Sequence, residues 1–483
     1  MNAPPTSLLW HDYETFGANP RQDRPAQFAA LRTDLALNPI GEPMSMYCRP
    51  ANDYLPDPEA CLITGITPQF CLQNGVAEYQ FASEIETALA RPGTVGVGYN
   101  TIRFDDEVTR FMFWRNLIDP YAREWQNGCG RWDLLDVVRV ARALRPEGIN
   151  WPVNDDGRAS FKLGDLTAVN GLAHESAHDA SSDVIATLAL ARLIREHQPR
   201  LFDFCFELHR KERVAQELGL PTSPSQARPF LHVSGMFATD HGCLALMWPL
   251  AMHPVNRNEL LAWDLRFDPG ELADLNAEQI RHRLFTRQAD LPHGQARLPV
   301  KSVHLNRSPM VFSNLKLLKG EMAERWQIEV QDHLKHAVVA RDLPDMSEIW
   351  LQVFARAEQV PGADIEQDLY GGFPTAADRR RLNELRALPA AELARARPAF
   401  DDGRLADLLW RYRARNHPDS LSPEELQHWD QQRAERLIDG AHGARSVKQL
   451  FDKLDALAQS VDDSGQAVLD ELYAYAEMVV PER

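Results

Sequence analysis

One segment near the N-terminus joins an apolar strand pattern to two acidic residues: Leu8-Leu9-Trp10-His11-Asp12-Tyr13-Glu14-Thr15-Phe16-Gly17. Successive side chains of a β-strand point to opposite faces, so Asp12 and Glu14 lie on the same face. Two carboxylates this close repel each other unless a cation lies between them. Oxygen ligands favour Mg²⁺ or Mn²⁺ over zinc. The same pair could instead be an exposed acidic turn, so further residues must decide.

A second acidic site follows an apolar run with small residues. Residues 94–100 read as a buried strand, and the next segment, Arg103-Phe104-Asp105-Asp106-Glu107, opens an apparent helix. An acid at a helix N-terminus is favourable for the helix dipole alone. Asp105 is therefore either a helix cap or a partner of Asp12 and Glu14.

A third acidic site lies at the start of a later helical pattern. In Ala177-His178-Asp179-Ala180-Ser181-Ser182-Asp183, Asp179 is placed as an N-cap and Asp183 falls in the first turns. His178 stands just before the helix. Alone this is an ordinary helix start, but chance rarely supplies four such acids and a histidine in these three contexts.

In this order the five residues resemble the catalytic set of the proofreading-type 3′→5′ exonucleases (the DEDDh type), which have a ribonuclease H-like fold. The resemblance implies that Asp12, Glu14, Asp105 and Asp183 hold two divalent metals and that His178 is the general base. Longer segments are similar to bacterial exonuclease I along essentially the whole chain. These segments are residues 11–17, 23–30, 62–69, 103–110, 131–137, 143–152, 232–237, 253–258 and 412–416.

Cutting a phosphodiester requires a nucleophilic water, charge relief on the phosphoryl oxygens and help for the leaving 3′-oxygen. Two cations about 3.5–4 Å apart can meet all three needs. We expect two Mg²⁺ ions, with Mn²⁺ able to substitute. Asp12 is expected to bridge them, Glu14 and Asp183 to complete the site nearer the attacking water, and Asp105 to serve the other. A neutral imidazole suits His178 to accept the proton of that water.

The 483 residues are too many for one core and suggest several domains. We expect an α/β exonuclease domain over residues 1–200 and a β domain with flanking helices over 201–355. An all-helical domain is expected over 356–483. Short β-type runs occupy residues 230–233, 243–250, 260–265 and 299–305. They fit a small barrel, and the resemblance implies an SH3-like one.

The net charge of −17 speaks against a nucleic-acid binder, but it is unevenly spread. Residues 1–198 carry 17 basic and 26 acidic groups, whereas residues 201–350 carry 17 and 19. Net charge sets long-range steering rather than local contact, so a basic channel can exist in an acidic protein. Candidate residues for a phosphate track are Arg103, Arg145, Lys162, Arg257, Lys301, Arg307, Arg413 and Arg415.

The resemblance also implies a substrate, a product and a partner. It implies processive degradation of single-stranded DNA to 5′-mononucleotides, in DNA repair and recombination. Substrate contacts are expected at Glu14, Phe16, Arg103 and Lys162, although Lys162 stands where relatives would have arginine. The expected partner is the single-stranded DNA-binding protein, whose acidic, hydrophobic C-terminal tail needs a basic pocket anchored by Arg145.

Location and oligomeric state are also expected from the sequence. No run of 18 uncharged apolar residues occurs, no basic segment opens the chain, and the six cysteines form no close pairs. These features predict a cytoplasmic protein with reduced thiols that does not enter a membrane; a monomer is the default. Two other functions stay open: an RNA-directed 3′→5′ exonuclease, and a non-catalytic single-stranded DNA-binding scaffold. The residues beyond position 200 argue against the first, and the complete acidic set against the second.

Overall fold

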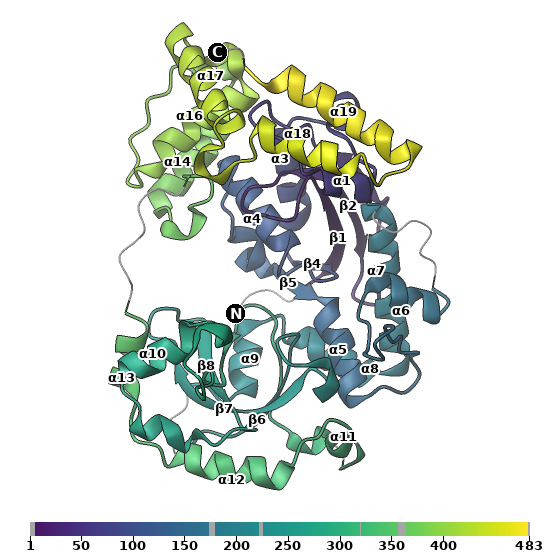
Figure 1. Cartoon of the computed structure of the whole chain (residues 1–483), viewed down its shortest axis with the longest axis vertical. Coiled ribbons are helices and arrows are strands. Elements are labelled where there is room, and N and C mark those ends of the chain that lie inside the picture. Colours follow the sequence, from purple (N-terminus) through teal and green to yellow (C-terminus); the bar gives the residue numbers. More distant parts are fainter. Residues whose placement is uncertain (1–4, 173–178, 222–225, 319, 356–363, 482–483) are drawn as a thin grey trace. The chain divides into compact units, whose positions relative to one another are not determined.

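The computed structural model (Figure 1) describes residues 5–172, 179–221, 226–318, 320–355 and 364–481. The chain forms two compact units, each described here by itself. The first unit comprises Met1–Gly130, His174–Ile185 and Val360–Arg483. The second comprises Arg131–Ala173 and Ala186–Gln359.

The first unit is built on β-strands that follow one another in the order β3-β2-β1-β4. Their bounds are β1 (Ser7–Thr15), β2 (Pro25–Thr33), β3 (Met44–Tyr47) and β4 (Thr94–Gly98). Strand β2 is antiparallel to both β1 and β3, whereas β4 is parallel to β1. Trp10 is fully buried, and its Nε1 donates a hydrogen bond to Thr33 Oγ1 at 3.0 Å. The apolar first half of β1 therefore fixes the central strand that carries Asp12 and Glu14.

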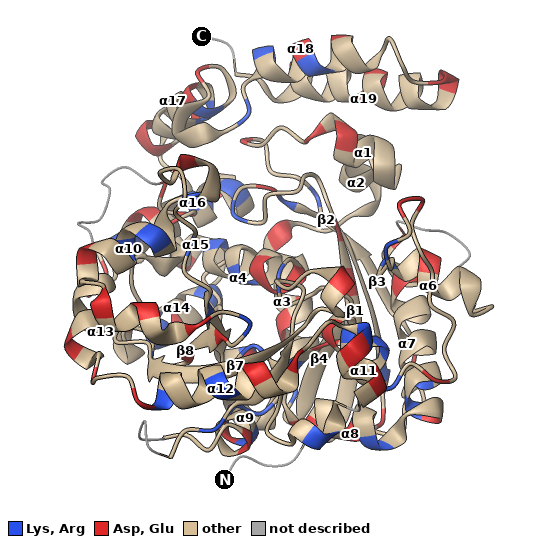
Figure 2. Cartoon of the chain, turned by 60° about the horizontal axis from the view of Figure 1, so that its bottom comes forward, with Lys and Arg blue, Asp and Glu red and all other residues tan. Residues whose placement is uncertain are grey.

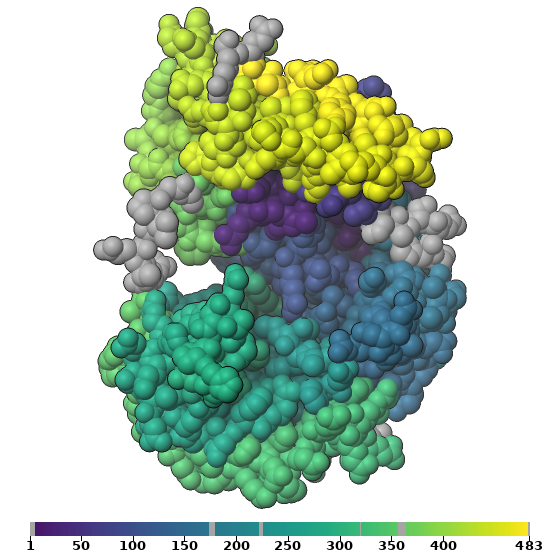
Figure 3. Space-filling view, viewed as in Figure 1, coloured from purple at the N-terminus to yellow at the C-terminus, as the bar shows by residue number. Residues whose placement is uncertain are grey.

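Helices from both ends of the chain belong to this unit. They are α1 (Pro58–Thr64), α2 (Pro68–Asn74), α3 (Glu78–Leu89), α4 (Asp105–Arg115), α14 (Ala376–Arg386), α15 (Ala390–Leu393), α16 (Arg404–Asn416), α17 (Pro423–Leu437), α18 (Val447–Leu457) and α19 (Asp463–Val479). Phe16 and Tyr54 share one apolar core with Leu450 and Leu472. Figure 3 shows the yellow C-terminal helices seated on the purple N-terminal residues.

Buried ion pairs join the same two parts of the first unit. The Arg415 guanidinium contacts Asp53 at 2.7 Å and Glu366 at 2.5 Å, and Glu366 also pairs with Arg24 at 3.0 Å. The nearby guanidinium groups hold the pKa of Glu366 well below its usual range despite the opposing effect of burial. The Arg413 side chain, only 6% exposed, pairs with Glu425 at 3.0 Å. These contacts contradict our placement of Arg413 and Arg415 in a phosphate track, because both guanidinium groups already form ion pairs with carboxylates.

The second unit contains most of the middle of the chain. The chain enters it within β5 (Gly130–Asp133), and α7 (Ala180–His197) passes into it from the first unit. Its other helices are α5 (Leu134–Leu144), α6 (Leu163–Val169), α8 (Pro199–Glu207), α9 (Lys211–Glu217), α10 (Ala277–Phe285), α11 (Gly320–Arg325), α12 (Val330–Arg341) and α13 (Ser347–Val353).

An antiparallel sheet of five strands in the order β10-β6-β7-β8-β9 forms the β part of this unit. The strands are β6 (Phe230–Val233), β7 (Leu244–Met252), β8 (Glu259–Asp264), β9 (Val300–His304) and β10 (Met310–Phe312). The four predicted β-type runs correspond to β6 through β9. Trp132 and Trp248 are 0% and 4% exposed and are core residues of this unit.

Charged residues of both signs are distributed over most elements (Figure 2). All six cysteines are free and buried. Among the described residues, no helix is both long and apolar enough to cross a membrane.

Candidate active site

Three of the predicted acids meet at one point of the first unit. Asp12 and Glu14 lie on one face of β1, as the alternation of strand side chains requires. Asp183 lies in the first turn of α7. One carboxylate oxygen from each of the three residues lies within 4.8 Å of the other two. The structure thus brings a strand and a late helix together as a possible metal site.

Asp105 joins this group through the backbone of β1. It is the first residue of α4, whose N-cap position is taken by Phe104. Its Oδ1 accepts a hydrogen bond from the backbone N–H of Tyr13 at 3.1 Å, and the residue is only 4% exposed. The alternative that Asp105 is merely a helix cap is therefore wrong, because its carboxylate turns to the strand between Asp12 and Glu14.

Burial and mutual repulsion together raise the pKa values of the clustered carboxyl groups. Burial raises the pKa of Asp12 well above its usual value, and the charges of Asp105, Asp183 and Glu14 raise it further. Burial and the charges of Asp183 and Asp179 raise the pKa of Glu14 to about 7. The charges that shift these groups most are all carboxylates, so a bound divalent cation would relieve the repulsion. The donor set is all oxygen and fits Mg²⁺ or Mn²⁺.

Sequence reasoning missed how Asp179 is held beside this cluster. Gln27 Nε2 donates to Asp179 Oδ1 at 3.0 Å, and the backbone N–H of Ser182 donates to Asp179 Oδ2 at 3.2 Å. Gln27 pairs with Glu14 across β1 and β2, and it is 2% exposed. A glutamine within an apolar strand pattern could have indicated a buried hydrogen-bond partner such as Asp179. Asp179 is therefore both the start of α7 and a fifth negative charge near the site.

Two predicted substrate residues of the first unit have different surroundings. Arg103 is exposed and lies two residues before Asp105. Phe16 is 1% exposed, and its ring packs in the apolar core near Tyr54, with a centroid distance of 6.4 Å. A buried ring offers no surface to a substrate, so we leave Phe16 out of the proposed contacts.

The remaining predicted residues lie elsewhere. Lys162 is exposed at the N-cap position of α6, in the second unit. Arg145, in the same unit, donates from Nη1 to the backbone oxygen of Leu317 at 3.2 Å. His178 lies outside the described residues.

A strand and two helix starts present these clustered carboxylates, an arrangement that could hold a divalent metal. The "Exonuclease" family model matches residues 9–191, the "Exonuclease I SH3-like domain" matches 209–356, and the "Exonuclease I C-terminal domain" matches 363–479. The chain is 44% identical over 483 residues to exodeoxyribonuclease I of Escherichia coli K12, covering 98% of each.

Solved structures agree in fold. An exonuclease I from Methylocaldum szegediense is 45% identical, with a TM-score of 0.92 over 98% of this chain and 100% of that one. A zinc-bound E. coli exonuclease I–ssDNA complex is 42% identical, with a TM-score of 0.91 over 99% and 100%. A crystal structure of SSB/Exonuclease I with the inhibitor CFAM is 41% identical, with a TM-score of 0.89 over the same shares.

The chain therefore belongs to the exonuclease I family and is an exodeoxyribonuclease. The predicted fold class is confirmed: an α/β exonuclease domain is followed by an SH3-like β domain and a helical C-terminal domain. The residue boundaries that we assigned to the three domains stay a prediction.

The raised pKa of Glu14 predicts how pH and metal affect stability. Without metal, folded Glu14 keeps its proton up to about pH 7, whereas the unfolded chain loses it near 4.5. Between these values the folded state binds more protons, so stability falls as pH rises, by about 3 kcal/mol from this group. Mg²⁺ binds the ionised site and should restore stability above pH 7, by about 2.7 kcal/mol at a hundredfold excess over Kd.

Urea unfolding in EDTA at pH 5.5 and 8, with and without Mg²⁺, measures about 2 kcal/mol of this effect, the part that accrues between pH 5.5 and 7. Glu14→Gln should flatten the pH dependence. The prediction would be contradicted if the metal-free protein were more stable at pH 8 than at pH 5.5 and Glu14→Gln showed the same pH dependence of stability.

Proposed function

We propose that this exodeoxyribonuclease degrades single-stranded DNA processively from the 3′ end to 5′-mononucleotides, using two Mg²⁺ ions for which Mn²⁺ can substitute. The observation that carries the proposal is the meeting of the Asp12, Glu14 and Asp183 carboxylates within 4.8 Å. The relative solved as an ssDNA complex with zinc supports both the substrate and the use of a divalent metal.

Each acidic residue has a proposed role. Two bound cations would supply charge relief at the phosphoryl group and lower the pKa of the attacking water. Asp12 is proposed to contact both cations, with Glu14 and Asp183 holding one and Asp105 the other. His178 would accept the proton of the attacking water. Arg103, exposed beside Asp105, is suited to hold a phosphate of the strand, and Lys162 stays a further proposed contact.

A 5′-labelled single-stranded DNA oligonucleotide tests substrate and polarity together. With Mg²⁺ we expect a ladder that shortens from the 3′ end, and with EDTA we expect none. The duplex and the RNA of the same sequence serve as comparisons. Preference for RNA would replace this proposal with an RNA-directed exonuclease, and no cleavage at all would leave a single-stranded DNA-binding scaffold. Dilution into excess unlabelled strand after the first cut measures processivity.

We also propose that the single-stranded DNA-binding protein binds through its C-terminal tail at Arg145. The SSB/Exonuclease I structure supports a partner of this kind. Arg145 is half-buried at the end of α5, and its ion-pairing capacity suits a terminal carboxylate. Monomeric state, cytoplasmic location and a role in DNA repair stay predictions.

Arg145→Glu should weaken binding of the tail peptide about tenfold to a hundredfold, because an attraction becomes a repulsion. Fluorescence anisotropy of the labelled peptide measures the loss. Since Arg145 also holds the Leu317 carbonyl, a thermal melt must accompany the measurement. Arg200→Glu, an exposed charge reversal in the same unit, is the matched control. Unchanged peptide affinity in a folded Arg145→Glu protein would exclude this anchor.

A further inference from the structure

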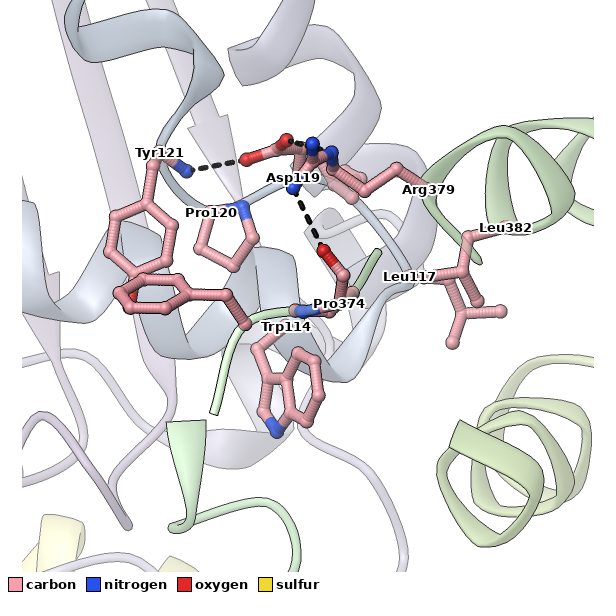
Figure 4. A pocket seen from close by; sticks show the side chains of 10 residues that line it. Trp114, Leu117, Asp119, Pro120, Tyr121, Pro374, Arg379 and Leu382 are labelled. Carbon is pink, nitrogen blue, oxygen red and sulfur yellow. Dashed lines mark hydrogen bonds and ion pairs between the residues drawn. The ribbon is translucent and has the colours of Figure 1, made fainter. Parts of the chain in front are cut away.

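The two helices that carry acids of the cluster are anchored by different means. Helix α4 begins at Asp105, and its last turn carries Trp114, which shares an apolar core with Leu382 of α14. The cavity that these two side chains help to line (Figure 4) has a volume of about 20 Å³, which is room for about one water molecule. Close packing therefore holds α4 in place. The start of α7, which carries Asp183, is tied to β2 by hydrogen bonds of one side chain, Gln27.

The Gln27 side chain has a donor and an acceptor, and both face the start of α7. Its Nε2 donates to Asp179 Oδ1 at 3.0 Å, and its Oε1 accepts from the backbone N–H of Ala180 at 3.4 Å. Ala180 is the first residue of α7. An ionised carboxylate can only accept and a backbone N–H can only donate, so one orientation of the amide satisfies both contacts. Gln27 therefore binds the helix start at two points.

The surroundings of the amide keep it in this position. Gln27 is 2% exposed, and a buried amide costs free energy unless its polar atoms are paired. Its Nε2 also lies 3.4 Å from Ser45 Oγ and 3.5 Å from the Tyr47 hydroxyl, both in β3. A shift of α7 away from β2 would leave the amide buried without its main partners. The cost of that loss opposes the shift.

The same contacts connect two acids of the cluster. Gln27 and Glu14 are Cα partners in the antiparallel pair of β2 and β1, and opposite residues of such a pair lie side by side on one face. On the helix side, the carbonyl of Asp179 accepts from the backbone N–H of Asp183 at 3.0 Å. Gln27 therefore fixes the helix turn that carries Asp183 relative to the strand that carries Glu14.

We propose that Gln27 is a positioning residue of the exonuclease: by holding the start of α7 against β2, it sets the spacing of the Glu14 and Asp183 carboxylates and thereby the affinity of the site for its divalent cation. The proposal rests on the proposed function, in which both acids hold one cation. A neutral amide suits this role because it binds Asp179 without adding a further negative charge to carboxylates that already repel one another. In this role Gln27 touches neither the cation nor the strand.

Gln27→Met keeps the length of the side chain and removes both contacts with α7. It should weaken Mn²⁺ binding to the DNA-free protein, followed by electron paramagnetic resonance, about 10- to 100-fold, the usual effect of losing a partner that orients a metal ligand. At a fixed, subsaturating Mg²⁺ concentration kcat should fall by a similar factor, whereas affinity for a 16-nucleotide strand in EDTA should not change. Tyr47→Phe removes the hydroxyl next to the same amide but keeps both contacts with α7, and it should behave as wild type.

An exchange of donor and acceptor tests whether Gln27 acts through Asp179. Gln27→Glu removes the donor and adds a charge that faces Asp179, so the loss should exceed that of Gln27→Met. Adding Asp179→Asn should recover most of this loss, because the asparagine can donate to the new carboxylate and the net charge equals that of wild type. The asparagine oxygen can still accept from the backbone N–H of Ser182. A general folding defect at either position would instead add up in the double variant.

Hydrogen–deuterium exchange of the metal-free protein tests the contact without the reaction. A peptide that begins at Ala180 should exchange faster in Gln27→Met than in wild type, and at the wild-type rate in Tyr47→Phe. Unchanged Mn²⁺ affinity in a folded Gln27→Met protein would overturn the positioning role, as would a double variant that recovers nothing. Failure of the wild-type protein to cleave single-stranded DNA would instead overturn the proposed function, and Mn²⁺ binding and exchange would still decide the role of Gln27.

Discussion

Asp183→Asn is expected to lose nearly all DNA hydrolysis, with kcat falling by about 10⁴-fold or more. The substitution removes one of three clustered carboxylates. An amide oxygen is a neutral, weaker ligand for Mg²⁺, and a 10⁴-fold loss corresponds to about 5.5 kcal/mol of transition-state stabilisation. Single-turnover cleavage of a labelled 16-mer at saturating Mg²⁺ measures the loss.

Strand affinity should change little in this variant, because Asp183 is proposed to hold a metal and not a phosphate. Binding of the 16-mer in EDTA should therefore be equal to or slightly tighter than wild type, since one negative charge near the strand is gone. Glu196→Gln makes the same charge change on an exposed position of the same helix and should keep full activity. Near wild-type turnover in Asp183→Asn would refute the proposed metal site.

The acidic cluster could be predicted because each part has a local signature. Strand alternation fixes Asp12 and Glu14 on one face, and the capping pattern places Asp183 in a first helical turn. Three such signatures in one chain allow few arrangements of the segments that carry them. A strand-to-helix junction and a helix start must both come close to the same end of strand β1. The resemblance to a known family indicated that the three acidic segments meet at one site, which periodicity alone does not indicate.

What could not be predicted depends on contacts between distant parts of the chain. We expected Arg413 and Arg415 to line a phosphate track, but Arg415 reaches Asp53, 362 positions earlier. Phe16 follows the acidic strand directly, yet it is buried in an apolar core that it shares with residues of α18 and α19. The local sequence pattern does not indicate which basic or aromatic side chain will be buried by a helix that is distant in the sequence. The role of Asp179 was missed for the same reason, because Gln27 holds it from another strand.

His178→Ala is expected to lower kcat by about 10²–10⁴-fold, the usual worth of a general base. The neighbouring residues support its role. Asp179, the next residue, is hydrogen-bonded to Gln27, and its charge raises the pKa of both Asp12 and Glu14. The chain therefore enters α7 beside the acids.

The pH profile distinguishes loss of a base from a structural defect. In the wild-type protein kcat should rise with pH as the imidazole loses its proton. In His178→Ala that step should disappear, and activity should recover partly at high pH, where hydroxide needs no base. His197→Ala, an exposed histidine at the far end of α7, should leave the profile unchanged. A His178→Ala protein that keeps the wild-type profile and rate would show that the proton leaves by another route, and the acidic cluster alone would then account for catalysis.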